Sequence, residues 1–271
     1  NLIKTGSGTM TLSGTNTFSG TTTVSQGTLS LSGLLGSGSY ASQLAVSSGA
    51  TFNVTTSSNQ TFSNWGAGTG TINLSGSGAV TLDGDQNFTG TVNVSQDFIV
   101  YNGTNSTSGS LGNATTIDIK DGGTLEIKEG GNSSSYDNSF IGTTGDPDIF
   151  IRSGGTLTTA STNNDRVYTI SGAITLNGGE MAWGNSTFSS DYGSWYFNND
   201  ISVTATSTLS APGMVTIQAG GVTFDVDSGV SLNITGYFYD AAIPTETTII
   251  FAGNGNKILS STSHTYTQSL Q

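Results

Sequence analysis

The sequence predicts an all-β protein, a parallel β-helix in which short strands wind into coils of roughly 20–25 residues. Two observations lead to this class. Short runs of alternating apolar and polar residues recur along the whole chain, and each begins at a glycine. Apolar residues make up only 33% of the 271 residues, so the expected core is narrow and runs the length of an elongated body.

The alternating runs give the strands in chain order. They are GTMTLSG (8–14), GTLSLSG (27–33), GATFNVT (49–55), GTINLSG (70–76), GAVTLDG (78–84), GTVNVS (90–95), GGTLEIK (122–128), GGTLTT (154–159), GAITLNG (172–178), GGVTFDV (220–226) and GVSLNITG (229–236). Thr, Val, Ile, Leu and Phe favour the strand positions, and Gly, Ser, Asn and Asp favour the turns between them. Helical periodicity is nearly absent.

The spacing of the runs favours a solenoid. The units at 27–31, 49–54 and 70–74 begin at nearly equal intervals, within the predicted coil length. Such a period is typical of coils that bury their apolar face only against the next coil, and stacked Asn or Thr side chains can then form hydrogen-bonded ladders. A β-sandwich is the alternative, but ten or more similar runs with few large apolar residues favour one elongated solenoid over residues 1–271.

Charge and composition exclude several functions. The formal net charge is −12 with only 6 Lys and Arg residues, so the chain lacks the basic surface that nucleic acids require. No apolar run approaches the ~20 residues of a membrane-spanning helix, and we expect no membrane insertion within this chain. There is no cysteine to form a disulfide, and no cofactor is expected. An acidic, lysine-poor surface suits an extracellular protein.

The N-terminal residues follow a longer spacing rule. The residues that carry it are Lys4, Gly6, Gly8, Met10, Leu12, Gly14, Asn16, Phe18, Gly20, Thr22, Val24, Gly27 and Leu29. This spacing resembles the passenger-associated transport repeat of bacterial autotransporters, with Met10 at the first Leu of that pattern. Residues 1–33 therefore form one repeat-like segment. Residues 76–96 resemble a degenerate second copy that lacks the initial Lys and the closing G-x-L.

The resemblance implies a right-handed β-helix that is displayed at, or secreted from, a bacterial surface. It implies a role in passenger export and folding rather than in catalysis. We therefore expect a non-enzymatic surface protein: a stalk, an adhesin passenger or a self-assembling subunit, with an irregular C-terminal end at 237–271. Asn1-Leu2-Ile3 and the tail HTYTQSLQ both read as strands, so we expect the terminal strand edges to pair with a neighbouring subunit.

Aromatic residues are concentrated in EMAWGNSTFSSDYGSWYF (180–197). Exposed rings beside Asn and Asp can stack on sugar faces, which makes Trp183, Tyr192, Trp195 and Tyr196 the candidate residues of a glycan-binding adhesin. The alternative is that these rings fill a wider coil or cover the core, a common use of aromatic side chains.

A polysaccharide lyase or glycosidase is a more remote alternative. Glycoside hydrolysis needs two carboxylates across a cleft, and Glu180, Asp191 and Asp200 lie near the aromatic stretch. The chain has almost no basic partners for them, and its single histidine, His264, lies in a Ser- and Thr-rich tail. We expect no catalytic residues.

Three acidic pairs are the candidates for a calcium site, Asp83/Asp85, Asp146/Asp148 and Asp225/Asp227. Two carboxylates are too few oxygen ligands for Ca²⁺, and no complete calcium-loop pattern is present. We therefore expect no metal site.

Overall fold

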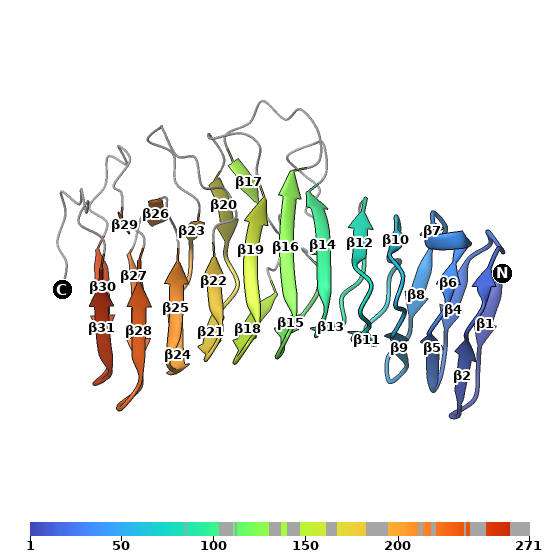
Figure 1. Ribbon diagram of the computed structural model, residues 1–271, viewed down its shortest axis with the longest axis horizontal. Coiled ribbons are helices and arrows are strands. Elements are labelled where there is room, and N and C mark those ends of the chain that lie inside the picture. The colour runs from blue at the N-terminus through green and yellow to red at the C-terminus, as the bar shows by residue number, and fades with distance from the viewer. Residues whose placement is uncertain are drawn as a thin grey trace.

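The computed structural model describes residues 1–84, 86–102, 111, 113–129, 137–139, 147–160, 167–182, 195–210, 214–217, 221–235, 237–238 and 248–260. In these ranges the chain is a parallel β-helix, which confirms the predicted all-β fold. The strands are stacked along one long axis, with the first and last described strands, β1 and β31, at opposite ends (Figure 1).

One side of the helix is a parallel sheet of eleven strands. They are β2 (Thr9–Leu12), β5 (Thr28–Leu31), β9 (Thr51–Val54), β11 (Thr71–Leu74), β13 (Thr91–Val94), β15 (Thr116–Ile119), β18 (Asp148–Arg152), β21 (Ile174–Asn177), β24 (Ile201–Ala205), β27 (Val222–Val226) and β30 (Ile249–Ala252). At a strand spacing of ~4.8 Å this sheet is about 50 Å long.

The second side is a parallel sheet of ten strands, each of which follows a strand of the first sheet in the chain. They are β7 (Ser39–Tyr40), β10 (Gln60–Phe62), β12 (Val80–Asp83), β14 (Asp97–Asn102), β16 (Thr124–Glu129), β19 (Thr156–Ala160), β22 (Glu180–Ala182), β25 (Ser207–Ser210), β28 (Ser231–Ile234) and β31 (Asn256–Leu259). Near the N-terminus, β3 (Thr15–Asn16) and β6 (Leu34–Leu35) form a two-stranded sheet, and a 3-10 turn at Gly36–Gly38 precedes β7.

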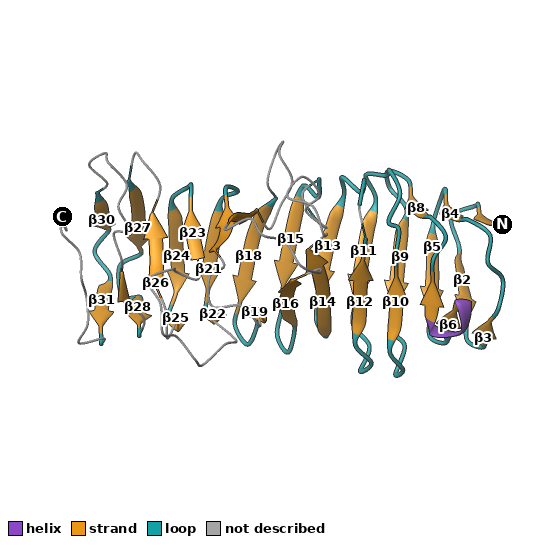
Figure 2. Cartoon of the chain, turned by 90° about the horizontal axis from the view of Figure 1, so that it is seen from above, coloured by secondary structure: helices purple, strands orange, loops and turns teal. Residues whose placement is uncertain are grey.

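The third side is less regular. It begins with β1 (Leu2–Lys4), β4 (Thr22–Val24) and β8 (Leu44–Val46), and single bridges at Trp65 and Phe88 continue the series. In the C-terminal half it becomes a five-stranded sheet of β17 (Asp137–Ser139), β20 (Val167–Ile170), β23 (Trp195–Phe197), β26 (Met214–Ile217) and β29 (Tyr237–Phe238). Figure 2 shows the coils from a second direction, with the loops at the strand ends.

The coil length matches the prediction in the N-terminal half and exceeds it in places further on. Thr51, Thr71 and Thr91 are paired in register, so each of these coils runs from one threonine to the next, as the spacing predicts. Thr116 pairs with Asp148, and the coil between them is longer than the predicted range. Although β15 and β18 are further apart in the chain, the two strands still pair in register.

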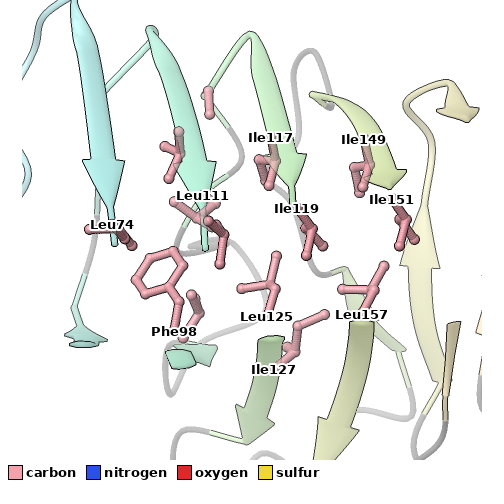
Figure 3. Packing of buried hydrophobic residues seen from close by; sticks show 14 of the residues in the cluster. Leu74, Phe98, Leu111, Ile117, Ile119, Leu125, Ile127, Ile149, Ile151 and Leu157 are labelled. Carbon is pink, nitrogen blue, oxygen red and sulfur yellow. The ribbon is translucent and has the colours of Figure 1, made fainter. Parts of the chain in front are cut away.

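The narrow core is filled from both long sheets. Inward residues alternate with outward ones along each strand, and the buried apolar residues form one cluster from Val24 to Ile249. Figure 3 shows Ile117, Ile119, Ile149 and Ile151 of the eleven-stranded sheet packed against residues of the facing sheet. One small layer of apolar side chains per coil is enough to fill this core, which explains the low fraction of apolar residues in the sequence.

A row of aromatic side chains runs through the N-terminal core. Phe18 meets Tyr40 at 6.1 Å between ring centroids, Tyr40 meets Phe62 at 6.4 Å, and Phe62 meets Trp65 at 6.2 Å. The buried Tyr40 hydroxyl lies 2.7 Å from the Thr22 hydroxyl. Burial raises the pKa of Tyr40, and the hydrogen bond to Thr22 offsets only part of this rise. The row thus carries aromatic contacts from one coil to the next.

The two repeat-like segments occupy different sides of the helix. Met10 and Leu12 lie in β2 of the eleven-stranded sheet, whereas Val80 and Leu82, at the same motif positions, lie in β12 of the ten-stranded sheet. The motif specifies alternation and turns, and these are compatible with any side of the coil. Sequence similarity between the segments therefore does not place them in one column.

We predict that Gly90→Ala destabilises the protein by about 3 kcal/mol, the upper range for an overpacked site. A Cβ atom at this position would lie 2.1 Å from the Gly70 carbonyl oxygen of the neighbouring coil. Gly14→Ala is the matched control, because its Cβ would meet no atom within 4 Å. Urea unfolding of both variants checks this; equal midpoints would contradict it.

Candidate functional site

The aromatic stretch does not place Trp195 on the surface. Trp195 lies in β23, has an exposed fraction of 0% and belongs to the core cluster. Phe197 is also buried, because alternate residues of a strand face the same side. Trp195 was therefore wrongly predicted as a glycan-binding residue, and its ring has the core-filling role of the alternative interpretation.

The other candidate glycan residues are placed only in part. Trp183 and Tyr192 lie outside the described residues. Tyr196 is described by its main chain alone, in β23. A glycan site at these three residues stays a prediction.

The carboxylates considered for catalysis bond to neighbouring coils. Glu180 in β22 accepts a hydrogen bond from the Ser210 hydroxyl of β25. Asp200 accepts one from the main-chain N–H of Thr223 at 2.7 Å. Glu180 lies in the ten-stranded sheet and Asp200 directly precedes β24 of the eleven-stranded sheet, while Asp191 lies outside the described residues. Both described carboxylates thus tie one coil to the next.

The acidic pairs proposed for calcium are described in part. Within the described ranges the exposed members are Asp83, Asp148, Asp225 and Asp227. Their neighbours Asp85 and Asp146 lie outside the described residues. Among the residues that the structure describes, no group of three or more His, Cys, Asp or Glu side chains is placed to hold a metal ion.

A regular polar surface covers the outer side of the eleven-stranded sheet at β5, β9, β11 and β13. Each strand alternates a half-buried polar residue with a buried apolar one. The polar positions are in register from strand to strand. We call this surface the threonine–asparagine face; it consists of Thr28, Thr51, Thr71 and Thr91 in one column and Ser30, Asn53, Asn73 and Asn93 in the next.

The asparagine column is a hydrogen-bonded ladder. The Asn93 amide donates to the Asn73 Oδ1 at 2.7 Å, and the Asn73 amide donates to the Asn53 Oδ1 at 2.8 Å. This confirms that stacked asparagines form ladders in this fold. The threonine hydroxyls of the face make no side-chain hydrogen bond to any described residue, and the threonine residues are half-buried.

The face ends at a charged cluster on the next strands. Asp118 follows Asn93 in register and is only 9% exposed. The Arg152 Nε donates to its Oδ1 at 2.6 Å, and the Lys120 Nζ lies 3.6 Å from its Oδ2. The hydrogen bond and the charge of Asp118 raise the pKa of Arg152. The guanidinium also lies 5.8 Å from the centre of the Phe150 ring, a cation–π distance.

The N-terminal segment holds a buried ammonium group at a corner of the coil. Lys4 is 6% exposed and donates to the carbonyl oxygens of Thr5, Gly6 and Gln26 at 2.9, 2.7 and 3.0 Å. The side chain of Gln26 in turn accepts a hydrogen bond from the Gly6 N–H at 3.3 Å. Three carbonyls replace the water that the ammonium loses on burial. The lysine of the motif therefore closes a corner between two coils.

The residues of this corner, Lys4, Thr5, Gly6 and Gln26, lie within a segment that matches a known repeat family. Residues 2–31 match the passenger-associated transport repeat. The match confirms the resemblance at the N-terminal end, and the repeat supplies the first five strands, β1 to β5. No curated protein and no solved structure matches the chain.

The parallel coils agree with a passenger-type β-solenoid, and the repeat supports a secreted or surface-exposed protein. In the described ranges, no helix has the length and apolar character needed to span a membrane.

Sequence reasoning did not identify the threonine–asparagine face, although its signal is present. Thr51-Phe52-Asn53, Thr71-Ile72-Asn73 and Thr91-Val92-Asn93 all have the pattern Thr-apolar-Asn-apolar. Their spacing equals one coil, which places the like residues in one column. Aligning the runs by their first threonine, rather than by their glycine, would have found it.

We predict that Trp195→Ala lowers the free energy of unfolding by about 3–5 kcal/mol, because it leaves a cavity in the core. Trp195→Phe, which keeps most of the apolar volume, should cost clearly less. Thermal unfolding followed by circular dichroism measures both. A Trp195→Ala protein of unchanged stability that loses glycan binding would show that the ring is exposed.

Proposed function

We propose that this chain is a rigid extracellular stalk within a passenger-type protein of the bacterial surface. The repeat at 2–31 supports the surface location, and the parallel coils support the passenger architecture. The observation that carries the stalk role is the single core cluster that extends from Val24 to Ile249. A continuous core leaves no described point at which one part of the rod could bend independently of the next.

The pairing between coils supports stiffness. Each strand of the two long sheets pairs with the strand of the next coil, so main-chain hydrogen bonds run along the rod axis. The corner contact of Lys4 and the ladder of Asn53, Asn73 and Asn93 add side-chain bonds in the same direction. Bending the rod would stretch these bonds on its outer side. A stalk holds a distal part away from the cell by this resistance.

Coil insertion tests the stalk. Three additional copies of residues 71–90, inserted after residue 90, should extend the rod by about 15 Å, one strand spacing per coil. Small-angle X-ray scattering gives the maximum dimension, and circular dichroism checks the β content. The control is an insert of the same composition in scrambled order, which should lose β structure. A folded variant without added length would contradict a stiff, modular rod.

End-to-end association is a second candidate function, favoured by the position of exposed apolar residues. In the described ranges the large exposed hydrophobic residues all lie in the first or last coil; they are Ile3, Met10, Ile250, Ile258 and Leu259. Met10 pairs with the buried Leu29, so it occupies an inward position that only another coil would cover. A second copy stacked head to tail would supply that coil by strand addition.

We predict that purified chains form rods whose length grows with concentration, and that Met10→Lys shortens them by placing a charge at the junction. The control is Thr11→Lys, the neighbouring outward position on the same edge strand β2. Electron microscopy over a concentration series at neutral pH distinguishes the outcomes. Single rods of constant length at every concentration would exclude head-to-tail stacking of this chain.

A further inference from the structure

The threonine–asparagine face is an uncharged area on a strongly acidic protein. The chain has a formal net charge of −12, yet the outward positions of β5, β9, β11 and β13 are threonine, serine and asparagine only. The charged residues begin one strand later, at Asp118. A partner of this face is therefore recognised by hydrogen bonds and shape rather than by charge.

The face is a regular grid. Neighbouring rows are separated by the strand spacing of ~4.8 Å. Neighbouring columns are separated by the rise of two residues along a strand, ~6.7 Å. The pairing from Thr28 to Thr51, Thr71 and Thr91 continues without a register shift. Threonine is stiff about its first side-chain torsion, and the asparagines are held by their ladder. The hydroxyl and amide positions therefore repeat with little freedom.

The asparagine and threonine columns differ in which polar groups remain without a hydrogen bond to another described residue. The amides of Asn73 and Asn93 are used within the ladder. No hydrogen bond joins the threonine hydroxyls to another described residue, and the threonine residues are half-buried on the outer side of the sheet. Folding needs β-branched or polar residues at these positions, but it does not need the same residue in each coil. The column thus offers a periodic row of hydroxyls to something outside the protein.

We propose that the threonine–asparagine face binds ice. A rigid periodic surface gains most from a partner with the same period, since each added contact then needs no further ordering of either side. Ice is a hydrogen-bonded solid of neutral oxygen atoms, and the rows of oxygens on its prism faces have spacings close to those of this grid. Crystalline polysaccharide fits less well, because none of these four strands has an outward aromatic ring that could stack on a sugar.

The opposite long sheet provides an internal comparison. Its outward column contains Thr61 and Thr81 in register, and then Ile99 and Glu126 interrupt it. Thr71 and Thr81 are both half-buried and lie in neighbouring strands of the chain, β11 and β12. We therefore expect a substitution at either position to have a similar effect on the fold, but only Thr71 lies within the four-row grid.

Ice-affinity partitioning of the full 271-residue chain tests the proposal. Ice is grown slowly from a dilute solution, and the protein in the ice and in the liquid is measured. The natural chain should be enriched in the ice, Thr71→Tyr should lose several-fold of that enrichment, and Thr81→Tyr should keep it. Tyrosine suits an outward strand position, and circular dichroism checks that both variants are folded. Thr71→Lys and Thr81→Lys form a second matched pair if a tyrosine variant does not fold.

Three results would overturn the proposal. The natural chain could be excluded from ice in the same way as an unrelated acidic protein. The Thr71 and Thr81 variants could lose enrichment equally, which would remove the role of the grid. The chain could bind cellulose or chitin powder while it stays out of the ice, which would make the face a polysaccharide surface.

Discussion

Each coil of this protein is held by main-chain pairing to the coils on either side, and this pairing determines what every position can contain. Strands in register stack like residue on like residue, so inward positions form apolar columns and outward positions form polar ones. Glycine is needed where the chain passes close to a carbonyl of the neighbouring coil, as at Gly90 beside Gly70. With only one thin apolar layer per coil, the chain folds with 33% apolar residues.

The fold class was accessible from sequence because both of its determinants are local. Period-two alternation gives the strands, and recurring glycines give the turns. The coil length was correct where connections are short, as from Thr51 to Thr71. The predicted coil length was too short for the coil from Thr116 to Asp148. A longer connection leaves the register of the paired strands intact, so strand pairing does not limit the length of a coil. No local pattern reports the length of a connection that the core does not constrain.

The candidate site was less accessible, for a physical reason. Successive residues of a strand point to opposite faces of the sheet. Because Trp195, Tyr196 and Phe197 are all aromatic, the sequence does not indicate which of them point inward. The structure shows that Trp195 and Phe197 are the inward residues. The stacked asparagines were foreseeable in kind, since the fold favours ladders. Asn53, Asn73 and Asn93 meet because β9, β11 and β13 pair in register, and sequence alone does not give that register.

The inward and outward columns of the eleven-stranded sheet differ in how uniform their residues are. Inward columns vary freely among apolar residues; Leu29, Phe52, Ile72 and Val92 occupy one column. The outward column beside it is threonine in every one of these strands, although the fold accepts Ile99 and Glu126 at outward positions of the other sheet. The residue type thus varies along the inward column but not along the outward threonine column. Packing alone does not require that uniformity, and the proposed contact with a periodic partner would explain it.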